Sequence, residues 1–208
     1  MSTLTLVRHA QATPFDTITD RLSPLGEEQS RRLGEYWRDR GVVHDEIYTG
    51  TLVRHLRTAE LAGIGNFTQD PAFNEYPAEA ILRASPDYVA TSDNRAFQKM
   101  FEAIMPRWMD GSLSAPDLES WIEFRERVTG GFRRILDSEA GNRRVLVITS
   151  GGPIGIAVQS ALGAPDPMAI ELNWRIRNCS ITEFIFTRGR VSLDVFNATP
   201  HLEAATFR

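Results

Sequence analysis

The alternation of short apolar runs with longer segments of helical periodicity is the feature that most constrains the fold of this 208-residue chain. An apolar run at 4–7 comes before a helical segment over 23–41, which a serine and a proline open. The pattern repeats with a weak strand at 46–49 and a helical segment at about 51–61. Strands that alternate with helices are typical of a mostly parallel sheet with helices on both faces.

The second half of the chain continues this framework and adds a different strand pairing at its end. Two more helices and three more strands are predicted at 117–140 and 153–162 and at 145–148, 181–187 and 191–196. The sequence Arg188-Gly189-Arg190 between the last two strands favours a hairpin, and therefore an antiparallel pair. We expect an α/β fold with three layers, α/β/α, whose mostly parallel sheet has antiparallel strands near the C-terminal end.

The size and composition of the chain favour a single domain over 1–208. Hydrophobic residues make up 42% of the chain and charged residues 24%, which is enough for a sizeable core. Five prolines between 71 and 116 interrupt the strand and helix pattern. We therefore expect short helices and loops in a variable insertion at about 77–120.

The composition also limits the partners and the compartment. A formal net charge of -4 gives no general basis for binding nucleic acid. No segment approaches the roughly 18 consecutive apolar residues that span a bilayer, and the apolar run at the N-terminus is too short for a signal peptide. The single cysteine, Cys179, fits a reducing compartment and is expected to be a small buried residue. These features predict a soluble cytoplasmic protein with no membrane contact.

Polar residues follow three of the predicted strands. Ligands of such folds bind beyond the carboxyl ends of the strands. In this sequence the segments at those positions are Arg8-His9, Thr49-Gly50 and Thr149-Ser150-Gly151. The last segment continues into two glycines and a proline that begin a helix, a place where backbone N–H groups can receive an anion.

The dipeptide Arg-His occurs twice, at Arg8-His9 and at Arg54-His55. His9 leaves a strand at the functional edge of the sheet, whereas His55 lies within a predicted helix. Adjacent side chains on a helix diverge, so we expect that Arg54 and His55 do not act together and that His55 lies on the helix surface.

Five groups of residues, in order along nearly the whole chain, carry a resemblance to a known family. They are LVRHAQA at 6–12, LSPLGEEQ at 22–29, IYTGTLVRHLRTAE at 47–60, VITSGGPI at 147–154, and NCSI with FNATPHL at 178–181 and 196–202. In these segments the sequence resembles the histidine phosphatase superfamily, and within it the phosphoglycerate mutase-like branch. The resemblance implies a phosphoglycerate mutase-like three-layer fold.

The resemblance also implies phosphoryl transfer through a phosphohistidine. His9 would be the nucleophile, Arg8 and Arg54 would hold the phosphate, and Glu75 would protonate the leaving oxygen. Arginine forks suit the equatorial oxygens of a transferring phosphoryl group, and a neutral imidazole can attack it without a metal ion or another cofactor. The alternative for Glu75 is an exposed glutamate in a loop.

Ser150 departs from the family pattern, because most members have a second histidine at this position. A serine hydroxyl can donate one hydrogen bond, and Gly151 with the helix N-terminus predicted at Pro153 can add amide groups, so Ser150 and Gly151 are expected to bind phosphate. The loss of a charged donor is expected to slow turnover by on the order of 10²-fold or more. His201 is a candidate replacement, for which a structural role is favoured.

The leading interpretation is a metal-independent phosphomonoester phosphatase that acts through His9 on a phosphorylated small molecule or a phosphoprotein. One alternative is a phospholigand-binding or interaction module that has lost turnover, which Ser150 favours. A further alternative is a phosphoglycerate mutase. The sequence favours no particular oligomeric state.

Overall fold

The computed structural model describes residues 1–13, 20–91, 93–137 and 141–203, and within them six strands form one sheet. The strand order across the sheet is β3-β2-β4-β1-β5-β6. Neighbouring strands from β3 to β1 pair in parallel, and β5 pairs antiparallel with both β1 and β6. The strands are β1 (Ser2–Arg8), β2 (Glu46–Thr49), β3 (Thr68–Gln69), β4 (Arg144–Thr149), β5 (Ile181–Thr187) and β6 (Arg190–Ala198). The predicted C-terminal hairpin is confirmed.

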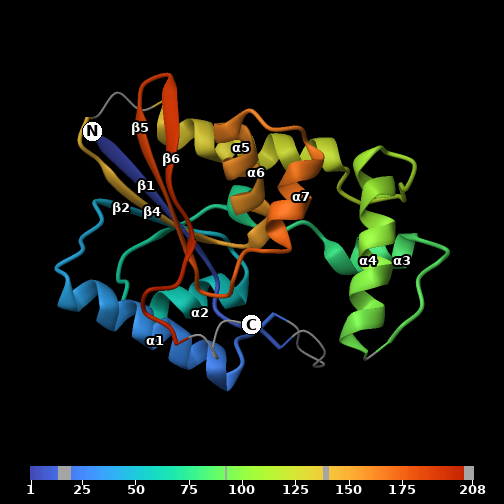
Figure 1. The fold of residues 1–208 in the computed structure, drawn as a ribbon, viewed down its shortest axis with the longest axis horizontal. Helices are drawn as coiled ribbons and strands as arrows, with labels where there is room; N and C mark the ends of the chain where they lie inside the picture. Colours follow the sequence, from blue (N-terminus) through green and yellow to red (C-terminus); the bar gives the residue numbers. More distant parts are fainter. Residues whose placement is uncertain (14–19, 92, 138–140, 204–208) are drawn as a thin grey trace.

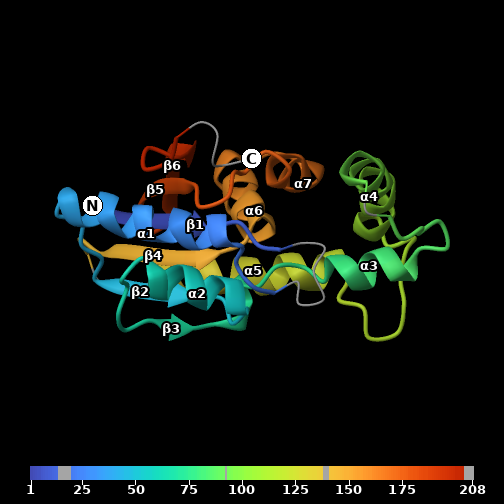
Figure 2. The same ribbon diagram turned by 90° about the horizontal axis from the view of Figure 1, so that it is seen from below.

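Helices cover both faces of this sheet. They are α1 (Pro24–Asp39), α2 (Val53–Leu61), α3 (Ala78–Ala84), α4 (Asn94–Met109), α5 (Trp121–Leu136), α6 (Gly151–Leu162) and α7 (Pro167–Asn173), with a short 3-10 helix, η1 (Pro71–Phe73). Figure 1 shows α1 and α2 on one side of the strands and α5 and α6 on the other. In both ribbon views α3 and α4 lie together at one end of the molecule (Figures 1 and 2). The predicted three-layer α/β/α architecture is confirmed.

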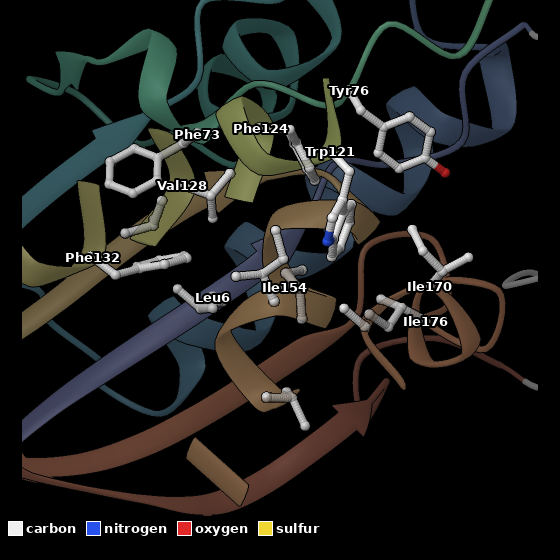
Figure 3. Packing of buried hydrophobic residues seen from close by; sticks show 14 of the residues in the cluster. Leu6, Phe73, Tyr76, Trp121, Phe124, Val128, Phe132, Ile154, Ile170 and Ile176 are labelled. Atoms are coloured by element: carbon white, nitrogen blue, oxygen red, sulfur yellow. The ribbon is translucent and has the colours of Figure 1, made fainter. Parts of the chain in front are cut away.

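Two hydrophobic cores form because successive strand residues point to opposite faces of the sheet. In β1, Leu4 and Leu6 pack into the larger core, whereas Val7 packs into the smaller core beneath α1 and α2. Figure 3 shows the larger core, where Leu6 lies near Phe132 and Ile154 from the helices that cover this face. The sheet is therefore fixed from both sides.

Local signals account for the starts of α1 and α5. The Ser23 hydroxyl accepts a hydrogen bond from Gly26 N at 3.0 Å, and Pro24 takes the first helical position, as predicted. At α5, Ser120 and Glu123 form a reciprocal capping box. Both helices thus begin at defined residues.

The central segment corrects one expectation, because α4 is a long helix rather than a short one. Pro106 lies inside it, where it removes one helical hydrogen bond. Burial of Ile104, Met105 and Trp108 in the larger core offsets this cost. The aromatic residues Tyr76 and Phe101 are buried in the same core.

A second correction concerns α6, which begins at Gly151 and not at Pro153. The N-cap residue is Ser150 itself, so the first helical amides come directly after the end of β4. The helix α7 was not predicted from the sequence. Over the residues that the structure describes, no helix has the length and apolarity needed to cross a membrane.

Candidate active site

The carboxyl ends of β1, β2 and β4 meet at one edge of the sheet. Arg8 is paired with Thr149 across β1 and β4, and Thr49 is paired with Ile148 across β2 and β4. The helices α2 and α6 both begin at this edge, so their first turns face the residues that follow the strands. The three segments selected from the sequence are therefore brought together, as predicted.

His9 is held by its backbone and by one ring nitrogen. Its side chain is almost fully buried, its N–H donates to Thr149 O at 2.8 Å, and its carbonyl accepts from Cys179 N at 3.2 Å. Nδ1 lies 2.7 Å from the carbonyl oxygen of Ala10. Because a carbonyl can only accept, the ring proton lies on Nδ1 and Nε2 keeps its lone pair.

Arg54 faces this lone pair from the first turn of α2. Its Nε lies 3.2 Å from His9 Nε2, to which it donates, and its Nη1 forms an ion pair with Asp20 at 2.8 Å. Asp20 also accepts from the backbone N–H groups of Val53 and Arg54, at 2.9 and 3.3 Å. One carboxylate therefore caps α2 and orients the guanidinium.

Arg8 contributes a second guanidinium, which is partly buried. Its Nη1 donates to the carbonyl of Ile176, while its buried Nε has no hydrogen-bond partner among the described residues. Burial lowers the pKa of Arg8 from its usual value, although an arginine stays protonated near neutral pH. A buried charged donor without a partner is suited to an anionic ligand.

Glu75 is not the exposed loop residue of the alternative interpretation. It is partly buried, and both carboxyl oxygens accept backbone N–H groups, one from Tyr76 at 3.1 Å and one from Gly152 at 3.0 Å. Burial raises the pKa of the Glu75 carboxyl, against the lowering effect of these hydrogen bonds and of Arg54 and Arg8. Gly152 allows this approach, because a Cβ there would lie 2.0 Å from Glu75 Oε1.

The electrostatics of the site keep the imidazole neutral. Burial lowers the pKa of His9 well below its usual value, and the charges of Arg54 and Arg8 lower it further. The site therefore combines an uncharged imidazole nitrogen with two cations and one carboxyl group. Within the described ranges, no group of three or more His, Cys, Asp or Glu residues is arranged to hold a metal ion.

His55 overturns the expectation that it lies on a helix surface. It is fully buried, its ring centroid lies 5.5 Å from that of His9, and its Nε2 lies 2.7 Å from Ser150 Oγ. The reason is that side chains of a helix's first turn lean back toward its N-terminus, so two adjacent residues there can reach the same sheet edge.

A sequence signal for this placement existed in the spacing. His55 shares a buried stripe with Thr58 and Ala59 of α2 and with Ala62, the C-cap residue, at intervals of three, four and seven residues. The small residues of that stripe mark the face of the helix that is turned toward the sheet and α1.

The other predicted residues are placed as follows. Ser150 is fully buried at the start of α6, and Gly151 occupies the first helical position, where a Cβ would lie 2.0 Å from Asn173 Oδ1. His201 packs against Tyr36 of α1, with ring centroids 5.9 Å apart, and burial lowers its pKa to about 4. Cys179 is buried, as expected.

Comparisons with known proteins show the family of this chain. A family model described as the histidine phosphatase superfamily (branch 1) matches residues 4–199. A probable phosphoglycerate mutase GpmB of Salmonella arizonae is 30% identical over 164 residues, which are 77% of this chain and 71% of that protein.

Solved structures share the fold. A phosphoserine phosphatase of Entamoeba histolytica, in complex with 3-phosphoglyceric acid, aligns with a TM-score of 0.71 at 21% identity, over 98% of this chain and 100% of its own. An α-ribazole phosphatase of Shigella flexneri aligns with a TM-score of 0.70 at 19% identity, over 95% of this chain and 96% of its own.

Proposed function

Because the chain belongs to the histidine phosphatase superfamily, we propose that it is a phosphomonoester phosphatase that works through a phosphohistidine at His9. The observation that carries this proposal is the tautomer of His9. Its Nδ1 proton is held by Ala10 O, and its Nε2 carries the lone pair, which accepts a hydrogen bond from the Nε of Arg54. A phosphoryl group that takes the place of this hydrogen bond would meet the nucleophilic lone pair and the guanidinium together.

In the first step, His9 Nε2 attacks the phosphorus and a P–N bond forms as the P–O bond of the ester breaks. Arg8 and Arg54 balance the charge that spreads over the equatorial oxygens. Glu75, protonated at the start, gives its proton to the leaving alkoxide, a role that its raised pKa supports. The products of this step are the free alcohol and phospho-His9.

In the second step, water attacks the phosphorus and the P–N bond breaks. The Glu75 carboxylate takes a proton from the water, which restores its acid form, and His9 Nε2 recovers its lone pair. The nucleophile must be neutral in each cycle, and the burial that lowers the pKa of His9 favours this state. The two arginines supply the positive charge, so no step requires a metal ion.

For the substrate, we infer a small phosphomonoester rather than a phosphoprotein. The names of the similar solved structures, phosphoserine phosphatase and α-ribazole phosphatase, favour this class. We place the reaction in the cytoplasm, since the buried single thiol of Cys179 fits a reducing compartment.

A mutase is the second candidate, because the 30% identical relative is named a probable phosphoglycerate mutase. A mutase returns the phosphoryl group to the product instead of giving it to water. Rates of phosphoglycerate interconversion and of phosphate release, measured in the same reaction, separate the two activities. A phosphatase releases phosphate faster than it interconverts the isomers.

The proposal is tested by hydrolysis of an aryl phosphate between pH 5 and 8 in the presence of EDTA, with the wild type beside His9→Ala. We expect turnover in the wild type and a loss of at least about 10³-fold in the variant. Labelled substrate quenched in alkali, where phosphohistidine persists, should leave label on the wild type alone.

The matched control is His44→Ala, which removes a partly buried imidazole before β2, away from the site edge. This variant should hydrolyse the substrate at the wild-type rate. The contrary outcome is an equal and negligible rate in the wild type and in His9→Ala, together with binding of inorganic phosphate. It would favour the interpretation as a phospholigand-binding module over that as a phosphatase.

A further inference from the structure

His55 and Ser150 form a buried imidazole–hydroxyl pair that the chemistry described above does not use. His55 Nε2 and Ser150 Oγ lie 2.7 Å apart, and both side chains have 0% exposure. Ser150 comes directly after Thr149, which is paired with Arg8, so it stands beside His9 at the edge of the sheet. The pair therefore lies directly beside His9, whose ring centroid is 5.5 Å from that of His55.

The Ser150 hydroxyl does not serve the role that an N-cap serine usually has. An N-cap hydroxyl accepts from the second or third helical N–H. In α6 the second N–H, of Gly152, donates to Glu75, and the third residue, Pro153, has no N–H. Accordingly, Ser150 makes no side-chain capping bond, and its hydroxyl is engaged by His55 instead.

The other ring nitrogen of His55 indicates which way this hydrogen bond runs. His55 Nδ1 is buried and has no hydrogen-bond partner among the described residues. It packs against Gly50 so closely that a Cβ on that glycine would lie 2.2 Å from it. A buried N–H without an acceptor is rarer in proteins than a buried acceptor without a donor, so the ring proton belongs on Nε2.

We propose that His55 Nε2–H donates to Ser150 Oγ and thereby directs the Ser150 hydroxyl proton to a phosphoryl oxygen at His9. His55 is then a positioning residue, and Ser150 is the residue that touches the substrate. This inference rests on the proposed function. Most family members have a histidine where this chain has Ser150, and here an imidazole from α2 supports the site instead.

The cost of burying His55 supports a role in the site over a role in packing. An imidazole with an unsatisfied nitrogen is less favourable in a core than an apolar side chain of similar size. Burial, followed by the charge of the adjacent Arg54, lowers the pKa of His55 well below its usual value, so the ring remains neutral. A neutral ring can hold one proton on Nε2, which is what the serine needs.

The experiment compares kcat and KM for an aryl phosphate in the wild type, Ser150→Ala, His55→Ala and the double variant. We expect each single variant to lose on the order of 10²-fold in kcat/KM, chiefly in kcat, by analogy with the removal of one oxyanion donor. The double variant should fall no more than about threefold below either one, because the two side chains act as a unit.

His55→Gln keeps an amide N–H near the position of Nε2 and should retain kcat/KM within about tenfold of the wild type. This variant separates positioning from folding, since a purely structural histidine is not rescued by a donor. His44→Ala, which removes a partly buried imidazole outside the site, is the control and should leave kcat and KM unchanged.

Three outcomes would overturn the inference: a wild-type kcat/KM in His55→Ala, losses that multiply in the double variant, or no rescue in a folded His55→Gln. If the wild type hydrolyses no phosphomonoester, the proposed function fails, but the inference can still be tested. Calorimetry with inorganic phosphate then measures whether His55 and Ser150 contribute to phosphate binding. Ser150→Ala and His55→Ala should each weaken phosphate binding by about tenfold, the loss of one charge-assisted hydrogen bond. Unchanged phosphate binding in both variants would refute the inference that His55 positions Ser150.

Discussion

At the scale of single residues, Glu75 shows how its position in the fold sets the orientation and the pKa of a carboxyl group. It follows η1 in a loop, yet its oxygens are held by Tyr76 N and by Gly152 N in the first turn of α6. Burial raises its pKa while the backbone donors hold its orientation. The carboxyl group is thus held in one orientation, and its raised pKa favours the protonated form more than in a free glutamate.

We expect Glu75→Gln to slow phosphate release according to the leaving group. An alkyl phosphate, whose alkoxide needs a proton, should lose on the order of 10²- to 10⁴-fold in kcat. An aryl phosphate with an acidic phenol should lose less than about tenfold, because its leaving group departs without that proton. Steady-state kinetics with the two substrates measure the difference.

The control for this substitution is Glu79→Gln, which changes an exposed carboxylate paired with Arg83 on α3. It should not alter either rate. Equal losses with both substrates in Glu75→Gln would show that the residue orients the phosphate and is not the acid.

At the scale of elements, α2 is the helix on which the site depends most. It carries Arg54 and His55, and its Thr58 hydroxyl accepts from Ala10 N at 3.1 Å, which ties the residue after His9 to the helix. α2 packs against α1 at a close contact of Gly34 with Ala62. α2 is therefore held both to the residue that follows His9 and to α1.

Gly34→Ala is expected to destabilise the fold by about 1–3 kcal/mol, since overpacking a close contact strains the core. The new Cβ would lie 2.3 Å from the backbone oxygen of Ala62, an atom that cannot rotate away. Urea unfolding followed by circular dichroism gives the free energy of unfolding.

Gly130→Ala in α5 is the matched substitution in a helix with space, where the nearest atom is Arg134 Nη1 at 3.9 Å. It should raise the free energy of unfolding by up to about 1 kcal/mol, because alanine restricts the unfolded chain and favours the helix. A gain of stability in both variants would contradict the close contact between α1 and α2.

At the scale of the whole molecule, the four histidines of the chain are all shielded from solvent to some degree. Burial lowers the pKa of His9 and His55 well below the usual value, and that of His44 and His201 to about 4. The unfolded chain protonates these rings below about pH 6.5, whereas the folded chain does not. Between about pH 6.5 and 4, the folded chain therefore binds fewer protons on its histidines than the unfolded chain does.

We expect the free energy of unfolding to decrease as the pH falls from 6.5 toward 4. Between these values the unfolded state binds more protons, so stability rises with pH, and each ring contributes at most about 1.4 kcal/mol per pH unit. The raised pKa of Glu75 acts in the opposite direction, but it belongs to one group. Urea midpoints at pH 7, 6 and 5 measure the slope.

The double variant His44→Gln and His201→Gln removes two of the titrating rings that lie outside the site. Its midpoint should depend less steeply on pH than that of the wild type. A midpoint that stays constant from pH 7 to 5 would show that the buried histidines take up protons without unfolding the chain.

The sequence by itself determined the framework and the residues at the ends of its strands. Apolar strand runs, the Ser23-Pro24 start of α1 and the C-terminal hairpin are local signals, and they report local conformation directly. The rule that parallel strands end at one edge then brought Arg8, His9 and Ser150 to a common site. The family resemblance added Arg54 and Glu75.

The tertiary structure alone decided the pairs that complete the site. Asp20 meets Arg54, His55 meets Ser150, and Glu75 meets Gly152, across 34, 95 and 77 positions of the chain. Each pair depends on how far a helix sits from the sheet and which way its first turn faces. The spacing in α2 marks which face of that helix is buried, but the partners of these pairs also depend on close contacts at small residues such as Gly34, Gly50 and Gly152, which no local pattern encodes.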